Sequence, residues 1–173
     1  MVKIELQKAP PVKEGPIEHL FACHRRIEDR LSILERAGAH LESAPGEALT
    51  AITNSLRFMD TSGVLHTVDE EQSVFPRLRG HLTQEELAYL DELESQHREA
   101  DRVYESLKGV VAALTHSRTP ELIQQYRDLV QRLAHAYRDH IASEDENLLP
   151  IGRRVLDEAE LREIHSEMRG RRG

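Results

Sequence analysis

Apolar residues recur every three or four positions through four long stretches of the chain, and this spacing is typical of one face of an α-helix. In the first stretch the stripe runs through Ile17, Leu20, Ile27, Leu31 and Leu34. The same spacing recurs in the other three stretches. The predicted helices span 16–42, 47–79, 83–115 and a segment from 120 to Pro150 or slightly beyond, and a short fifth helix is predicted at 157–168.

Short breaks separate these stretches and carry the residues that begin or end helices. Pro16 suits the first helical position, and Pro45-Gly46 interrupts the chain. Thr83 and Glu86 form a capping-box pattern. Because short connections make sequential helices antiparallel neighbours, we predict an all-α fold, an up-down-up-down four-helix bundle with a short extra C-terminal helix.

The length of 173 residues indicates one domain. We expect an extended N-terminal segment at 1–15, where prolines discourage regular structure, followed by the bundle at 16–168. Residues 169–173 form a small basic tail that we expect to be frayed. The chain is 31% charged and has no tryptophan, which fits helices with one wet face.

The charge and cysteine content narrow the partners and the compartment. A net charge of −8 argues against nucleic-acid binding, which favours a basic face. No apolar run approaches the roughly 20 residues of a membrane span, and the N-terminus lacks the apolar centre of a secretory signal. A single cysteine, Cys23, excludes an internal disulfide framework. We therefore expect a cytoplasmic protein with no nucleic-acid or membrane partner.

The predicted inner faces carry six polar residues in a duplicated pattern. A His-x-x-x-Glu pair occurs twice, followed each time by an apolar residue and a proline, and each pair is preceded 42 or 43 positions earlier by a lone histidine in a His-Arg dipeptide. The second copy lies 73 to 74 residues after the first. The six residues are His24, His66, Glu70, His97, His140 and Glu144.

Burying an ionised carboxylate without a partner is costly, so two glutamates among four histidines on core stripes need a common partner. Residues i and i+4 share one helix face, which lets each His-x-x-x-Glu pair point a nitrogen and an oxygen into one space. The simplest arrangement gives each of two metals two histidines and lets both glutamates bridge. Nitrogen and oxygen ligation without thiolate suits iron or manganese better than structural zinc, and we favour iron.

Four segments around these residues resemble a known family. They are CHRRIEDRL around His24, HTVDEEQSVFP around His66, QHREADRVY around His97 and HIASEDENLLP around His140. Over approximately residues 16–156 the chain is similar to the hemerythrin-like, or HHE cation-binding, domain family. The resemblance implies two iron ions in an oxo- or hydroxo-bridged non-heme centre inside a four-helix bundle, with the six residues as ligands.

The chain also differs from the oxygen-carrying hemerythrins. Those proteins have a second histidine one turn after the first on the third helix, where this sequence has Asp101, and a longer His-to-Asp spacing on the fourth. The four-His, two-Glu set looks more like the bacterial iron-centre repair proteins and the hemerythrin-like stress proteins. The repair proteins carry a cysteine-bearing N-terminal domain that has no counterpart in this sequence. Reversible oxygen carriage is therefore not our first hypothesis.

Three functions remain open on the sequence. The leading hypothesis is a di-iron protein that binds or reacts with O2, NO or peroxide in sensing, detoxification or stress response, together with an unidentified redox partner. The alternatives are an iron-handling or iron-centre repair module and a di-iron enzyme of peroxidase or oxidase type. Such an enzyme needs a proton donor, and Tyr104, two turns beyond His97, is the aromatic candidate, although core packing is the simpler interpretation of this residue.

The residues around the six have simpler interpretations. Cys23 is expected to be a packed small hydrophobe. His19 and His135 each stand five residues before a proposed ligand and should point away from it. The remaining histidines are interpreted as structural or exposed: His40, His81, His116 and His165. Four acidic residues are expected on the wet face, one of them a candidate to orient a ligand imidazole: Asp69, Glu71, Asp145 and Glu146.

Overall fold

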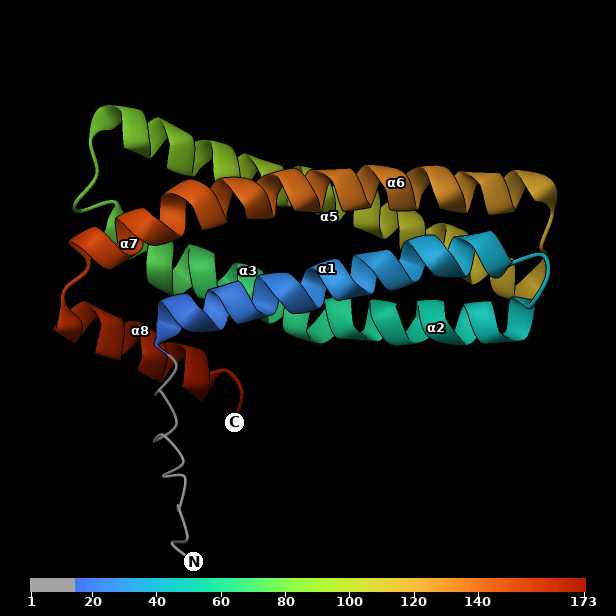
Figure 1. The fold of residues 1–173 in the computed structure, drawn as a ribbon, viewed down its shortest axis with the longest axis horizontal. Coiled ribbons are helices and arrows are strands. Elements are labelled where there is room, and N and C mark those ends of the chain that lie inside the picture. The colour runs from blue at the N-terminus through green and yellow to red at the C-terminus, as the bar shows by residue number, and fades with distance from the viewer. Residues whose placement is uncertain (1–14) are drawn as a thin grey trace, which may run out of the picture.

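The computed structural model describes residues 15–173, and four antiparallel helical rods form a bundle with one helix across an end (Figure 1). The α-helices are α1 (Pro16–His40), α2 (Pro45–Phe58), α3 (Val64–Asp69), α4 (Phe75–Leu78), α5 (Gln84–His116), α6 (Pro120–Ser143), α7 (Leu149–Val155) and α8 (Glu158–Gly170). The second rod comprises α2 to α4, and the fourth comprises α6 and α7. No strand occurs in the described range. The predicted fold class is confirmed; the predicted segment 1–15 falls, except for Gly15, outside the described residues.

The second and fourth rods are interrupted by π-helical turns where five residues fill a turn. They are η1 (Met59–Gly63), η2 (Glu70–Val74) and η3 (Glu144–Leu148). In η2 and η3 the closing bond runs from the N–H of Phe75 or Leu149 back five residues to the carbonyl of Glu70 or Glu144. Each of these two turns therefore begins at the glutamate of a His-x-x-x-Glu pair, and π-turns within helices are frequent at functional sites.

The helix starts follow the predicted signals. Thr83 and Glu86 exchange both capping-box hydrogen bonds at the start of α5, as predicted. Thr119 accepts a hydrogen bond from the Leu122 N–H and caps α6. A second capping box, formed by Asp157 and Glu160, begins α8. The helix at the C-terminus thus has its own well-defined start.

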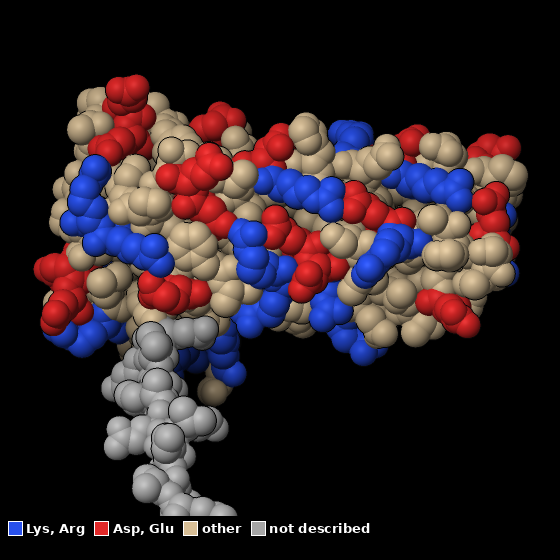
Figure 2. All heavy atoms as spheres, in the orientation of Figure 1, with Lys and Arg blue, Asp and Glu red and all other residues tan. Residues whose placement is uncertain are grey.

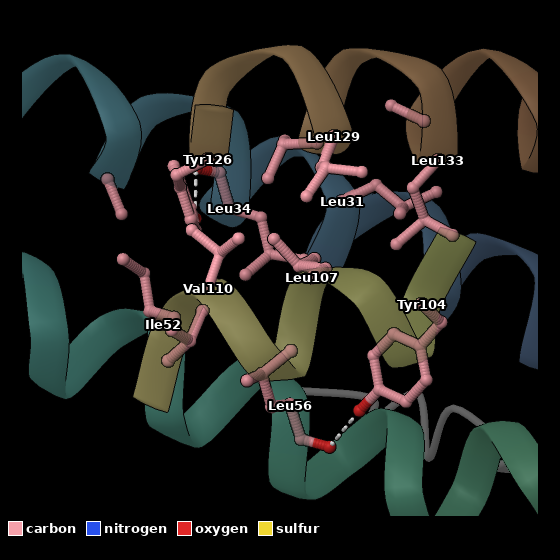
Figure 3. Close-up of a cluster of buried hydrophobic side chains, with 14 of the residues drawn as sticks. Leu31, Leu34, Ile52, Leu56, Tyr104, Leu107, Val110, Tyr126, Leu129 and Leu133 are labelled. Carbon is pink, nitrogen blue, oxygen red and sulfur yellow. Dashed lines mark hydrogen bonds between the residues drawn. The ribbon is translucent and has the colours of Figure 1, made fainter. Parts of the chain in front are cut away.

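Two apolar clusters fill the bundle. The larger, here called the distal core, packs α1, α2, α5 and α6 around residues such as Leu31, Leu107 and Leu133 (Figure 3). Two buried tyrosines in it donate hydrogen bonds to backbone carbonyls, Tyr126 to Leu34 and Tyr104 to Leu56. These bonds let the phenols pack at full depth without leaving a polar atom unsatisfied.

The smaller cluster, here called the α8-side core, joins the start of α1 to α4, α5, α7 and α8. Along α1 the chain passes from Leu20 of the α8-side core to His24 and then to Ile27 of the distal core. Along α5 it passes from Leu93 of the α8-side core through His97 into the distal core. The predicted ligands therefore occupy a polar layer between two apolar clusters.

The C-terminal residues differ from the expected frayed tail. Arg171 and Arg172 form ion pairs of 2.8 and 2.6 Å with Asp69, whose carboxylate is fully buried. The expectation that Asp69 lies on the wet face is wrong, because α8 covers it and brings the two guanidinium groups to it. Helix α8 itself extends to Gly170, past the predicted end at 168.

The surface carries both signs of charge. On the face shown in Figure 2, basic and acidic side chains alternate over the helices instead of segregating into one patch. In the part of the chain that the structure describes, no helix has both the length and the apolar character that crossing a bilayer requires.

Candidate metal centre

All four rods contribute to one buried polar cluster. It contains the six side chains singled out in the sequence, and the two His-x-x-x-Glu pairs meet the lone histidines of α1 and α5. Their ligand atoms form two groups, each within 4.8 Å: His24, His66, Glu70 and Glu144 in one, and His97, His140, Glu70 and Glu144 in the other. Both carboxylates belong to both groups, which is the arrangement that two bridging carboxylates require.

The imidazole Nε2 atoms point inward at the carboxylates. The Nε2 of His24 lies 3.2 Å from Glu144 Oε2 and 3.7 Å from Glu70 Oε1. The Nε2 of His66 lies 3.2 Å from Glu70 Oε1, and that of His140 lies 3.4 Å from Glu144 Oε2. These contacts bring imidazole nitrogens next to the carboxylate oxygens, yet neither carboxylate has a hydrogen-bond partner among the described residues.

Two of the histidines are oriented from outside by acidic side chains. Nδ1 of His24 lies 2.6 Å from Asp145, and Nδ1 of His97 lies 2.8 Å from Glu71. When these Nδ1 atoms donate, the Nε2 lone pair of each ring is directed toward the cluster. The sequence offered one such acid among the four flanking candidates. The structure provides two such acids. Asp145 follows Glu144 in the fourth rod, and Glu71 follows Glu70 in the second.

The remaining two histidines differ from each other. Nδ1 of His140 lies 3.0 Å from the side-chain carbonyl oxygen of Gln96, which accepts its hydrogen. Nδ1 of His66 is buried and has no hydrogen-bond partner in the described part of the chain. Gln96 was not predicted from the sequence, and its position gives no signal, because the residue at the matching place before His24 is Cys23.

The charges of the cluster shift its pKa values strongly. Burial lowers the pKa of His24, but Glu144 and Glu70 more than reverse this and raise it to about 10. Burial also lowers the pKa of His97, and Glu70 more than reverses this, so that the pKa rises to about 9. The pKa of His66 is lowered, chiefly by burial. Without a metal, protons on the two lone histidines therefore neutralise the carboxylates.

Both glutamates remain ionised in this setting. Burial alone would raise the pKa of Glu70, but the neighbouring imidazoles, led by His66, hold it well below 4.5. Burial and the charge of Glu70 oppose ionisation of Glu144, yet His140 and His24 keep its pKa below the usual value. The cluster thus holds two adjacent negative charges away from water.

The donor set fits a pair of metal ions. Both oxygens of both glutamates and Nε2 of His24 are buried without a hydrogen-bond partner among the described residues, which is unusual for native polar groups. Nε2 of His97 and Nε2 of His140 lie 2.9 Å apart. Two nitrogens bound to one ion at 2.0–2.1 Å are about 3 Å apart when they subtend a right angle. Shared cations would satisfy all of these atoms together.

Tyr104 is packed in the distal core, which is the simpler interpretation that the sequence offered. Its hydroxyl lies 3.0 Å from the Leu56 carbonyl and 3.0 Å from Asp60, and these two acceptors share its one hydrogen. The candidate proton donor of the enzyme hypothesis is thus hydrogen-bonded to the second rod. Phe75, which the sequence did not indicate, stacks its ring parallel to that of His97 with centroids 6.1 Å apart.

A small cavity is lined by residues that lie next to, or one helical turn from, three of the clustered histidines. Its volume is about 30 Å³, enough for a water-sized molecule. Its wall includes Thr67, next to His66, and Asp101, one turn after His97. Tyr137, one turn before His140, also lines it. Burial, reinforced by the charges of Asp101 and Glu70, raises the pKa of Tyr137.

The other histidines lie outside the cluster, as expected. His135 is exposed and pairs with Asp139, and His81 pairs with Glu160 on the surface. His19 lies 3.6 Å from the Sγ of Cys23. Cys23 is buried, as expected for a packed small residue, although its sulfur also accepts a hydrogen bond from Arg26.

Comparison with known families agrees with this geometry. The hemerythrin HHE cation-binding domain model matches residues 15–151, which include all six clustered side chains and end before α8. None of the curated proteins compared with the chain matches it in sequence. The family match covers most of the chain, and the helical bundle and the buried His/Glu cluster agree with it. The chain belongs to the hemerythrin HHE cation-binding domain family, and it is a metal-binding protein.

Proposed function

We propose that the protein is a non-heme di-iron protein that binds or reacts with O2, NO or peroxide in sensing, detoxification or stress response. The proposed ligands are His24, His66, His97, His140, Glu70 and Glu144. The observation that carries the proposal is that both carboxylates belong to both ligand groups. Two cations bridged by two glutamates account for all four buried carboxylate oxygens that lack a partner in the described range.

Iron is favoured because the donors are imidazole nitrogens and carboxylate oxygens without thiolate, a set that suits iron or manganese. When bound, a pair of iron ions supplies electron transfer and open positions for a small ligand. The protein contributes the orientation of the rings through Asp145, Glu71 and Gln96. It also excludes bulk water, because both glutamates are fully buried.

The cavity supports a ligand of the size of O2, NO or peroxide. Its volume admits only a very small molecule, and residues adjacent to three of the proposed ligands line it. Because the pKa of Tyr137 is raised, its phenol keeps its proton at neutral pH and is available as a hydrogen-bond donor to a molecule in the cavity. Thr67 and Asp101 add polar groups to the same wall.

We infer a setting without nucleic acid or membrane, with an unidentified redox partner. The mixed surface charge in Figure 2 shows no basic face on the side displayed. The single, buried cysteine is compatible with a reducing compartment, which supports a cytoplasmic location.

The metal content and the visible spectrum of freshly purified protein test the centre. We expect two irons per chain with oxo-to-iron charge-transfer bands. Glu70→Ala should lose the metal, whereas the control His116→Ala, at the exposed end of α5, should keep it. Protein that binds no metal under iron-replete expression and after anaerobic reconstitution would refute the proposal.

Anaerobic reduction followed by O2, NO or peroxide tests the ligand. We expect at least one of the three to change the optical spectrum of the loaded protein. If the iron-loaded protein keeps its spectrum with all three, the ligand-binding function is wrong while the metal assignment stands.

A further inference from the structure

The C-terminal end of the chain contacts the segment that carries His66 and Glu70. Arg171 binds Asp69 Oδ1 at 2.8 Å and Arg172 binds Asp69 Oδ2 at 2.6 Å, so the two guanidinium groups saturate one carboxylate. Arg171 also donates to the hydroxyl of Ser73 at 2.8 Å. The family match ends at residue 151, before α8 and both arginines. The contact is therefore an addition of this chain to the family's matched region.

Asp69 lies directly before Glu70 and three residues after His66 in the rod. Its side chain is fully buried, whereas the arginines are partly exposed. A buried carboxylate whose partners are removed keeps an uncompensated charge, and this is strongly destabilising. The local backbone then relaxes by turning Asp69 toward water. Because Asp69 follows His66 by three residues and directly precedes Glu70, such a rotation displaces both, and His66 belongs to only one of the two ligand groups.

Helix α8 is fixed independently of these arginines. Ile164 and Met168 are buried in the α8-side core. Arg77 of α4 forms ion pairs with Glu163 and Glu167 of α8. The helix therefore presents Arg171 and Arg172 from a docked position, and removing the arginines does not by itself remove the docking.

The corresponding position in the fourth rod has a different contact. Ser143 stands 74 residues after Asp69, as Glu144 does after Glu70. The contact that the structure shows there is neutral: the Tyr89 hydroxyl lies 2.8 Å from the Ser143 carbonyl and 2.7 Å from its hydroxyl. His66 is also the one cluster histidine whose Nδ1 has no partner in the described range. The His66–Glu70 segment is thus held by the two arginines, whereas the His140–Glu144 segment is held by Tyr89 and Gln96.

We propose that Arg171 and Arg172 are positioning residues for the metal position formed by His24 and His66. They neutralise Asp69 and thereby hold the turn from His66 to Glu70 in ligating geometry. This inference rests on the proposed function, because it requires metal at the two ligand groups. It assigns α8 a role in metal retention that is greatest at the position containing His66.

The test follows release of iron from loaded protein to a chelator. In Arg171→Gln/Arg172→Gln we expect one of the two irons to leave about 10- to 100-fold faster than in the unmodified protein, the range known for groups that orient metal ligands. The other iron, which shares Glu70 but not His66, should leave faster by a clearly smaller factor. Arg171→Lys/Arg172→Lys, which keeps both charges, should restore most of the retention.

Two further variants separate positioning from general stability. Ile164→Ala removes buried apolar contacts that dock α8 and leaves the ion pairs of Asp69 in place, so it should lower the melting temperature without selective iron release. Adding Asp69→Asn to the double glutamine variant removes the buried charge and should slow the fast iron release. This second result would not follow if the arginines served only to dock α8.

The outcomes distinguish this inference from the proposed function. Unmodified protein that never holds two irons overturns both. A second outcome overturns only the role of the arginines. In it the unmodified protein holds two irons, and the double glutamine variant releases both at the unmodified rate or both equally faster. If the double glutamine variant does not fold, the single variant Arg172→Gln decides, since Arg171 still pairs with Asp69 in it: faster release of one iron than of the other supports the inference, and release of both at the unmodified rate overturns it.

Discussion

The two copies of the duplicated unit keep the same ligands but support them differently. Both have a His-x-x-x-Glu pair, a π-turn that begins at the glutamate, and a proline after the turn. In the copy that joins His97 and His140, both Nδ1 atoms have a partner. In the copy that joins His24 and His66, only His24 has one among the described residues. The donor set is thus symmetric, whereas the groups that orient it are not.

The residue before the lone histidine differs between the two copies. Gln96, before His97, accepts from His140, and the residue at the matching place before His24 is Cys23. The thiol is too short and too weak an acceptor to act as an amide does. Its sulfur instead accepts from Arg26 on the same helix, and Nδ1 of His66 stays without a partner in the described range. The two copies therefore differ in the positions that flank the ligands.

The largest expected effect removes what the two copies share. Glu144→Ala deletes a carboxylate that belongs to both ligand groups, so both metal positions should be lost and the iron content should fall from two to near zero. Elemental analysis of the purified variant measures this. One iron retained at full affinity would show that the copies bind independently and that Glu144 does not bridge.

The next effect separates the copies. Asp145→Ala removes the anchor of His24, and Glu71→Ala removes that of His97. Each should weaken iron binding about 10- to 100-fold at one position, and the two variants should affect different positions. Competitive chelator titration measures both. Glu146→Ala is the matched control, because this exposed neighbour of Asp145 changes the same charge next to the same π-turn.

The sequence predicts the helical bundle and the six clustered residues because both depend on the spacing of residues along the chain. The two i, i+4 pairs on apolar stripes identify four of the clustered residues, and the repeated offset of 42 or 43 positions identifies the two lone histidines. The Thr83–Glu86 capping box predicts the start of α5. The partners of Nδ1 come from other rods, so their identity depends on packing and register that one sequence does not express. The ion pairs of Asp69 were missed for the same reason: a basic tail after a short helix gives no sign of the buried acid that it will contact.

The stability of the metal-free protein should depend on pH, because the lone histidine of each copy carries a proton when no metal is bound. The folded pKa values of His24 and His97, about 10 and about 9, lie above the ordinary 6.5. Between pH 6.5 and 10 the folded state therefore binds more protons than the unfolded state, and stability falls as pH rises. We expect the melting temperature of metal-free protein to decrease across this window. The iron-loaded protein should decline less, because metal replaces the protons; a flat or rising curve for the metal-free protein would contradict the assignment.

The smallest expected effect makes the two copies alike. Gln96→Ala removes the one neutral anchor, so that Nδ1 of His140 loses its partner and resembles Nδ1 of His66. Because the bond is between uncharged groups, we expect a loss of retention toward the lower end of the range for the acidic anchors, about tenfold, at the His97 and His140 position. Chelator release should then show two irons leaving at more similar rates than before. Ser95→Ala, an exposed change one residue earlier on α5, is the control. A wider separation of the two rates in Gln96→Ala would mean that the anchored copy is already the weaker one, and that burial and the arginine pairs of Asp69 outweigh hydrogen bonds to the ring nitrogens.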